Sequence, residues 1–576
     1  MTLKEDRTDQ TPPQHTTFAL ENPMRLAINH LERLVDATGQ TYFDVFMTDP
    51  AEAVHDWPDF VDLPSRYLEA AIMARQMLGT KIKTEDALRR RVLSTLQRDG
   101  LAHRPETPYT REGAYTGEQG LVLKALNTLY MDSPDPGIAK RMRAMVDGLG
   151  RVTTRRSELY FAIRPLVQSW RTIDYGPALD LAEQLASELM YQTSQYGVDG
   201  SYRGHHHSHL GTLAGVLSYA LVAGKTDLVT KVKKCFDFAV SMSTRFGFVP
   251  EIAQRKADIV GCETCAIMDY LDVAILLARN GHPQYWDVVE KTARNHLVES
   301  QIRDGSWLED GPSQGDTDRI VYTGVPSRVV GAFAGWSSPD HYLAFEDELW
   351  PSWCKDESQY PFYLGKIRAL QNCCAGSGLR AIFQVWRNIA CLQGEDLYVN
   401  LNIDKKIRGA TVVGYQPYEG RTSVKVDLTC RLHVRIPGFV TASDVSIAVN
   451  GSPVRFEVEG PYAVLGRVEA GASVEMTYPL PVWEEDIVIG NPGYKSFRYR
   501  VMWKGDTVVQ VVPDSNNAKA GYSDMTGRDV RLYYAGQGPG KLYDRAHLLR
   551  RPLAIRASDA KLDTSTVDWY DLYRQR

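Results

Sequence analysis

The sequence predicts two kinds of structure in one chain, an (α/α)6 barrel followed by a C-terminal antiparallel β-sandwich. Apolar residues recur with helical spacing through the first two-thirds of the chain. Several of these segments are apolar on more than one face, which is typical of helices that touch other helices on all sides. After residue 392 the pattern changes to an alternation of apolar and polar residues with period two, which indicates strands.

The helical part contains about twelve segments, separated by loops that carry Gly, Pro and Asp. The predicted helices are 26–34, 63–78, 84–98, 117–131, 137–148, 177–195, 208–223, 227–243, 265–280, 284–301, 328–336 and 375–389. Six inner and six outer helices would form the two concentric rings of an (α/α)6 barrel. The segments show no repeat of fixed length, so a strict solenoid is less favoured.

The second part is punctuated by Gly, Pro and Asn-Gly turns, as expected for short antiparallel strands. The predicted strands are 396–403, 422–436, 444–449, 452–458, 472–478 and 507–512. The first twenty residues are polar and rich in Pro, Gln and Thr, which is typical of disorder. We therefore expect a disordered lead-in over residues 1–20, the barrel over 21–390 and a β-sandwich region over 391–576. That last region could hold two small sandwiches.

Composition narrows the class of protein. A chain of 576 residues is expected to form two or three domains, and its 43% hydrophobic and 24% charged residues are ordinary for a globular protein. The net charge of −5 favours neither nucleic acid nor an anionic membrane as a partner. Apolar runs are too short to span a bilayer, and the polar N-terminus lacks the apolar core of an export signal. We expect a cytoplasmic protein with reduced cysteines.

Four of the eight cysteines occur in two places, Cys262 with Cys265 and the adjacent pair Cys373-Cys374. Both places precede an apolar helical run, so the thiols are expected at helix N-termini. Unpaired N–H groups and the helix dipole favour the thiolate there. Several thiolates beside the Glu263 carboxylate predict a Zn²⁺ site. The alternatives are inert buried cysteines and a purely structural zinc, since the second pair lacks the usual C-x-x-C spacing.

Loops rich in aromatic and polar residues connect the helices, for example residues 199–209 and 303–307. Helical barrels carry function at the loops of one end, where aromatic faces suit sugar rings and His, Asp and Arg suit hydroxyl groups. Trp307, His207 and His209 are therefore candidate substrate contacts. Ordinary packing is the alternative for the tryptophan, and a metal role or surface placement for the histidines.

The cysteine arrangement, Glu263-Thr-Cys265 followed by Cys373-Cys374, resembles the zinc–cysteine site of glycoside hydrolase family 127. These are the β-L-arabinofuranosidases, with family 146 as close relatives. The similar stretches are 62–71, 373–403, 432–439, 449–451 and 497–514. The resemblance covers most of residues 24–515 and implies the same order of barrel and sandwich.

The resemblance also implies roles for the four residues. Cys373 would be the nucleophile that attacks the anomeric carbon, and Glu263, Cys265 and Cys374 would complete the Zn²⁺ ligand set around it. A retaining glycosidase usually employs a carboxylate nucleophile. Here a thiolate would replace it and form a thioglycosyl intermediate, with overall retention of configuration. Cys262 could take the place of Glu263 or be a bystander.

The retaining mechanism also requires an acid/base group, which in the family is a glutamate shortly before the E-x-C motif. Glu251, twelve residues before Glu263, is the candidate, with Asp258 in reserve. His209 is similar to a sugar-binding histidine of the family. The family's vicinal cysteines are followed by Pro-Pro-Asn, and here by Ala-Gly-Ser. This departure leaves the identity of the sugar open.

The sequence therefore predicts a zinc-dependent, retaining, exo-acting glycoside hydrolase whose substrate is an oligosaccharide or glycoside. A furanoside such as β-L-arabinofuranoside is the first expectation. One alternative is a polysaccharide lyase or sugar epimerase on the same barrel, with a structural zinc. Another is a non-catalytic carbohydrate-binding or zinc- and thiol-sensing protein. A homodimer through the sandwich is left open.

Overall fold

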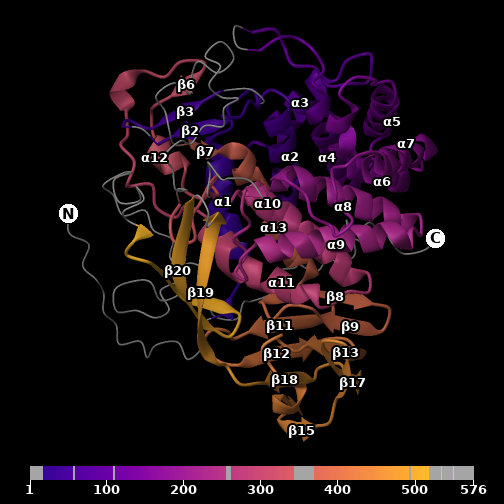
Figure 1. The fold of residues 1–576 in the computed structure, drawn as a ribbon, viewed down its shortest axis with the longest axis vertical. Coiled ribbons are helices and arrows are strands. Elements are labelled where there is room, and N and C mark those ends of the chain that lie inside the picture. Colours follow the sequence, from indigo (N-terminus) through magenta and orange to yellow (C-terminus); the bar gives the residue numbers. More distant parts are fainter. Residues whose placement is uncertain are drawn as a thin grey trace.

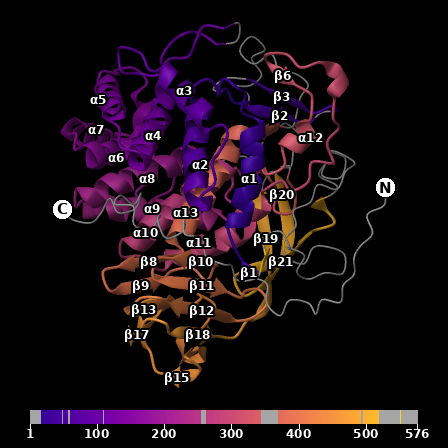
Figure 2. The ribbon, with the colours of Figure 1, turned by 180° about the vertical axis from the view of Figure 1, so that it is seen from behind.

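The computed structural model describes residues 17–47, 49–55, 59–107, 110–253, 261–342, 369–491, 495–517, 534 and 549–550. Most helices lie together at the upper right of Figure 1, most strands of the last part of the chain lie below and to the left of them, and one small sheet lies beside the helices at the upper left. The view from behind shows the same arrangement, with α1 (Glu21–Arg33) and α2 (Asp62–Leu78) on the near side (Figure 2). Most of the predicted lead-in and the reserve acid/base Asp258 lie outside the described residues.

Within the described residues, six helices form a closed inner ring. They are α2 (Asp62–Leu78), α4 (Thr116–Asp132), α6 (Ile163–Ile173), α8 (His206–Val222), α10 (Thr264–Arg279) and α13 (Asn372–Asn388). Each packs against the next, and α13 packs back against α2. Helix α10 is buried at every position from Thr264 to Ala278, because it has neighbours on all sides.

In chain order, one outer helix precedes each inner helix. Before α13, the short helix α12 follows the outer helix α11. The outer helices in the described part are α1 (Glu21–Arg33), α3 (Glu85–Thr95), α5 (Pro136–Gly150), α7 (Gly176–Ser187), α9 (Thr226–Met242) and α11 (Tyr285–Thr292). They bury one face and expose the other; α5 buries Ile138, Met142 and Leu149. This alternation is the (α/α)6 barrel, and the predicted fold class is confirmed.

Two helix predictions were wrong, and each has a physical reason. The inner helix α6 was missed although its apolar residues recur with helical spacing, because the segment is short and Pro165 in its first turn resembles a helix break. The predicted helix 328–336 is only the short α12 (Val325–Arg328) followed by irregular chain. Gly331 adopts a φ of 100° there, a left-handed conformation that a continuing helix cannot hold.

The chain changes from helices to strands where β8 follows α13. Among the described residues, one sheet has the order β16-β17-β13-β9-β8 and another the order β10-β11-β12-β18-β14-β15. The first comprises β8 (Ala390–Gln393), β9 (Asp396–Val399), β13 (Cys430–Arg435), β16 (Glu457–Glu459) and β17 (Tyr462–Val468). The second comprises β10 (Lys405–Ile407), β11 (Ala410–Gly414), β12 (Arg421–Val426), β14 (Ser446–Val449), β15 (Ser452–Val454) and β18 (Ser473–Thr477).

The two sheets share one apolar core and form a β-sandwich. Leu397 and Leu432 of one sheet and Val412 and Val474 of the other are fully or almost fully buried in it. The alternating burial along β12 shows the period-two pattern that predicted these strands. A further described sheet, β19 (Val482–Asn491), β20 (Lys495–Lys504) and β21 (Thr507–Pro513), packs against the barrel instead.

Two small sheets position the ends of inner helices. In one, β7 (Ala369–Gln371) pairs with β2 (Asp44–Phe46), which also pairs with β3 (Glu52–Val54), and β3 pairs with β6 (Ile320–Val321). Strand β7 runs directly into α13. In the other, β4 (Gly204–His205) pairs with β5 (Ile252–Ala253). The described residues include no helix that is long and apolar enough to cross a membrane.

Gly378 on α13 is expected to tolerate no larger side chain. A Cβ atom there would lie 2.1 Å from the buried ring of Phe333, which cannot move aside easily. We expect Gly378→Ala to lower the free energy of unfolding by about 1–3 kcal/mol, measured by urea denaturation. The control is Gly376→Ala on the same helix, where the nearest atom lies 3.4 Å away, in ordinary contact. Equal stability of the two variants would contradict this packing.

Candidate active site and metal centre

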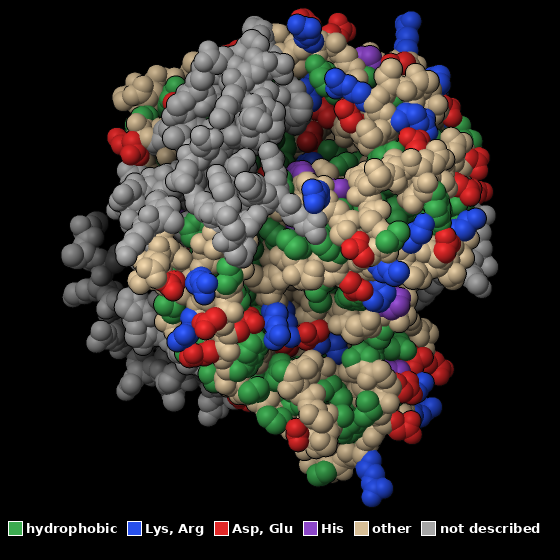
Figure 3. Space-filling model, in the orientation of Figure 1, with side chains coloured by type: hydrophobic (Ala, Val, Ile, Leu, Met, Phe, Trp, Pro, Cys, Tyr) green, Lys and Arg blue, Asp and Glu red, His purple; other side chains and the backbone are tan. Residues whose placement is uncertain are grey.

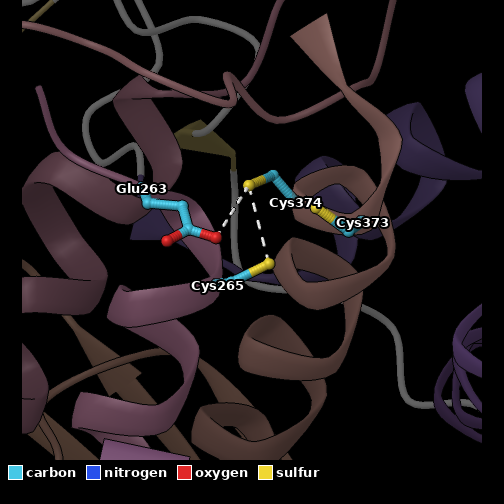
Figure 4. A group of neighbouring side chains, drawn as sticks. All are labelled: Glu263, Cys265, Cys373 and Cys374. Atoms are coloured by element: carbon cyan, nitrogen blue, oxygen red, sulfur yellow. Dashed lines mark hydrogen bonds between the residues drawn. The ribbon is translucent and has the colours of Figure 1, made fainter. Parts of the chain in front are cut away.

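Two helix N-termini of the inner ring meet at a group of four side chains. Glu263 is the residue directly before α10, Cys265 lies in the first turn of α10, and Cys373 and Cys374 lie in the first turn of α13. One donor atom from each of the four lies within 4.8 Å of the other three. Figure 4 shows the sulfurs of Cys265 and Cys374 facing each other across the two helices, 3.5 Å apart. The sequence prediction had named the same four residues.

This donor set fits a zinc ion. Thiolate and carboxylate are ligands that Zn²⁺ prefers, and four donors match its usual coordination number. The N-termini of α10 and α13 also stabilise negative charge on groups in their first turns. Cys262 is not part of the set in the described residues; its sulfur accepts a hydrogen bond from the N–H of Val249 and lies in the core. The alternative in which Cys262 replaces Glu263 therefore has no geometric support.

The three thiols of the group differ in exposure and acidity. Cys265 and Cys374 are fully buried, while Cys373 keeps 8% of its surface exposed. Hydrogen bonds from the other two thiols lower the pKa of Cys373 to about 6, although burial opposes the shift. Burial raises the pKa of both Cys265 and Cys374 well above the ordinary value. Of these three, Cys373 is the thiol that is both ionised near neutral pH and reachable from outside.

A second group adjoins the first through Glu263. One donor atom each of His205, Glu251 and Glu263 lies within 4.8 Å of the others. Pairing of β4 with β5 brings the histidine to this place, and its Nε2 lies 2.5 Å from Oε2 of Glu263. One carboxylate oxygen of Glu251, Oε2, is buried without a hydrogen-bond partner.

The two carboxyl groups have opposite pKa shifts. Burial, reinforced by the negative charge of Glu263, raises the pKa of Glu251 to about 7. Burial acts on Glu263 in the same direction, but the charge and hydrogen bond of His205 outweigh it and lower its pKa to about 2. Paired carboxyl groups with separated pKa values are typical of acid/base sites. Glu251 can therefore exchange a proton near neutral pH while Glu263 stays anionic.

The side chains of the clustered histidines contact different partners in the structure; these are His205, His206, His207 and His209. Helix α8 begins at His206, and His205 has an extended backbone, so His205 and His209 do not share a helical face. His207 lies with Nδ1 2.5 Å from Oδ2 of Asp269. His209 has Nε2 2.9 Å from the carbonyl oxygen of Arg203. Histidine side chains border a hollow on the barrel face in the space-filling view (Figure 3).

The predicted sugar contacts therefore occupy different surroundings. The ring of His209 also packs on that of Tyr202, with centroids 4.3 Å apart, whereas it is His205 that contacts the Glu263 carboxylate. Trp307 is half-buried, and its indole N–H donates to the carbonyl oxygen of Asp304 within the same loop. The roles of His207, His209 and Trp307 as substrate ligands stay predictions.

Sequence reasoning missed the contacts of two residues that border the metal group. For His205 it offered a metal role only through the i, i+4 spacing to His209, which did not point to Glu263. Arg66 lies on α2 with Nη1 3.9 Å from the sulfur of Cys265. Its one local signal is the i, i+4 spacing to Asp62, which pairs with it and says nothing about distant cysteines.

Comparison with known proteins agrees with this fold. A GH127 β-L-arabinofuranosidase from Geobacillus stearothermophilus T6 superposes with a TM-score of 0.54 at 16% identity, over 85% of this chain and 80% of that one. A structure described as a glycoside hydrolase gives 0.59 at 15% identity, over 87% and 84%. A further GH127 β-arabinofuranosidase gives 0.57 at 15% identity, over 86% and 85%.

Comparison at the level of sequence found no related family or protein. No family model matches the chain, and no curated protein matches it. The resemblance to glycoside hydrolase family 127 is thus confirmed at the level of the fold, across barrel and sandwich together. At these identities the likeness shows the fold alone, and the chemistry depends on the site.

Proposed function

We propose that this protein is a retaining glycoside hydrolase in which Cys373 is the nucleophile and Glu251 the acid/base. One observation carries the proposal. A partly exposed, acidic thiol and a buried carboxyl group of raised pKa each lie within 4.8 Å of an oxygen of Glu263. A nucleophile and a proton donor placed around one point are what glycoside hydrolysis with retention requires.

The metal of the proposal is zinc, held by Glu263, Cys265, Cys373 and Cys374. When bound there, zinc would keep the sulfurs as thiolates at neutral pH and fix their positions. The chain's own contribution is to bring four donors together from two helices and to leave Cys373 accessible.

The proposed reaction has two displacements. The sulfur of Cys373 attacks the anomeric carbon and forms a C–S bond, while the C–O bond to the leaving group breaks and Glu251 donates its proton to that oxygen. Glu251, now a carboxylate, then takes a proton from water as the water oxygen attacks the same carbon. The C–S bond breaks, Cys373 leaves as thiolate, and the two inversions give net retention.

The proposed substrate is a terminal furanoside such as β-L-arabinofuranoside, on an oligosaccharide or simple glycoside. Two of the structural neighbours are described as β-arabinofuranosidases, which supports this class. The Ala375-Gly376-Ser377 segment after the cysteines departs from the Pro-Pro-Asn of the family, so the preferred sugar can differ.

The test is turnover of a panel of p-nitrophenyl glycosides, β-L-arabinofuranoside included, with the anomer of the product followed by NMR. We expect one member to react and to give a product of retained configuration first. A first product of inverted configuration would contradict the assignment of Cys373 as nucleophile. An unsaturated or epimerised product would support the lyase or epimerase alternative instead.

Removal of zinc is expected to destabilise the protein. A ligand that binds the folded state at about 1,000 times its Kd contributes about 4 kcal/mol, and the four donors have no common position in the unfolded chain. We therefore expect chelation with EDTA to lower the midpoint of thermal unfolding by several degrees. Zn²⁺ should restore it and Mg²⁺ should not, because thiolates prefer the softer ion. An unchanged midpoint in protein assayed as metal-free would contradict the site.

A further inference from the structure

Arg66 places a buried positive charge beside the metal-binding thiols. It lies on the inner face of α2 with 7% of its surface exposed. Its Nε donates to Oδ1 of Asp62 at 2.5 Å, and Nη1 lies 3.9 Å from Sγ of Cys265 and 3.5 Å from Oγ of Ser377. The guanidinium therefore links a carboxylate on its own helix to groups on α10 and α13.

The charge of the donor set explains why a cation is needed here. Three thiolates and one carboxylate carry four negative charges, and a divalent ion offsets two of them, which leaves two. Burying such an excess is costly unless fixed positive groups lie nearby. His205 meets the carboxylate end at Glu263, and Arg66 meets the sulfur end at Cys265.

An arginine side chain is well suited to contact a carboxylate and a thiolate at the same time. Arginine stays protonated in a protein interior, and its planar fork can bond a carboxylate and face a thiolate together. Nε of Arg66 donates to Asp62, which fixes the guanidinium. Nη1 therefore faces the sulfur of Cys265 while the hydrogen bond to Asp62 is kept. A lysine would keep the charge but not this two-sided contact.

We propose that Arg66, fixed by its ion pair with Asp62, is a positioning residue which stabilises the zinc–thiolate group by directing the positive edge of its guanidinium at the sulfur of Cys265. This inference depends on the metal of the proposed function, not on the reaction. It assigns no contact with substrate to Arg66. Loss of Arg66 is therefore expected to lower the affinity for zinc, because its guanidinium contacts the sulfur of Cys265, one of the proposed ligands.

The test measures zinc affinity by competition with a chromophoric chelator, in the absence of substrate. We expect Arg66→Met to weaken binding about 10–100-fold, the usual cost of losing a partner of a metal ligand. Arg66→Lys should fall between this variant and the wild type. Arg75→Met is the matched control, because Arg75 lies on the same helix and pairs with Glu85 and Asp132 instead. Its affinity should equal that of the wild type.

The outcomes separate this inference from the proposed function. Wild-type affinity in Arg66→Met would overturn the role of Arg66, as would equal weakening in Arg75→Met. If Arg66→Met does not fold, Arg66→Gln retains polar contacts without the charge and carries the same expectation. A wild-type protein that binds no zinc would overturn the metal site and this role together. Full turnover by Cys373→Ser would overturn only the proposed mechanism.

Discussion

Replacing Cys373 by serine is expected to abolish turnover while the protein stays folded. A serine hydroxyl is not ionised near neutral pH, so the variant lacks the anion that attacks the anomeric carbon. We expect kcat on the most reactive aryl glycoside to fall by at least about 10³-fold, as for other nucleophile removals. Far-UV circular dichroism and zinc content should be measured on the same sample, since Cys373 also belongs to the donor set.

A matched control separates loss of the nucleophile from loss of a buried thiol. Cys235 on α9 is buried, and it lies outside the donor group. Cys235→Ser should keep wild-type turnover. Mass spectrometry of the wild type quenched with a slow substrate should show one glycosyl unit on the peptide that contains Cys373. Normal turnover by Cys373→Ser would exclude a thiolate nucleophile and favour a carboxylate pair or a lyase.

Glu251→Gln is expected to impair substrates with poor leaving groups most. An alkoxide leaving group needs the proton of Glu251, whereas a dinitrophenolate leaves without help. We expect kcat/KM on alkyl glycosides to fall about 10²–10⁴-fold. The first step on a dinitrophenyl glycoside should stay fast, and added azide should speed release of the sugar as glycosyl azide of retained configuration.

The pH profile provides a second readout for this residue. The acid must be protonated, so wild-type kcat/KM should fall as pH rises through the pKa of Glu251, about 7. Glu251→Gln should lack that limb. Glu118→Gln is the control, because burial likewise raises the pKa of Glu118 to about 7, but that residue pairs with Arg104. An equal loss in Glu251→Gln for good and poor leaving groups would exclude an acid/base role.

The spacing of apolar residues predicted helices and strands correctly where burial of apolar side chains is the main factor that sets the pattern. Helix α10 is buried over almost its whole length, so its run of apolar residues could be recognised without a partner. Strand β12 shows alternating burial for the same reason. Helix α6 was missed for a different reason, since its apolar residues keep helical spacing but the segment is short and contains Pro165. Its buried Arg164 pairs with Asp272 on α10, a partner that the local sequence does not show.

Glu263, Cys265, Cys373 and Cys374 could be named from the chain alone because the chemistry of thiols restricts their roles. Their spacing on two helix starts is a local property that the sequence carries. Which thiol stays accessible, and that Cys262 is excluded from the donor group, depends on how α10 and α13 meet. No local pattern records that meeting.

The order of barrel and sandwich, the helix starts that carry thiols and the candidate carboxylates could all be recognised in the chain itself. Which side chains contact these groups became known only from the folded arrangement. It brought His205 to Glu263 through the pairing of β4 with β5, and it brought Arg66 to Cys265 across the inner ring. The physical reason is that hydrophobic spacing is written into each segment, whereas charge compensation depends on distances between segments far apart in the chain.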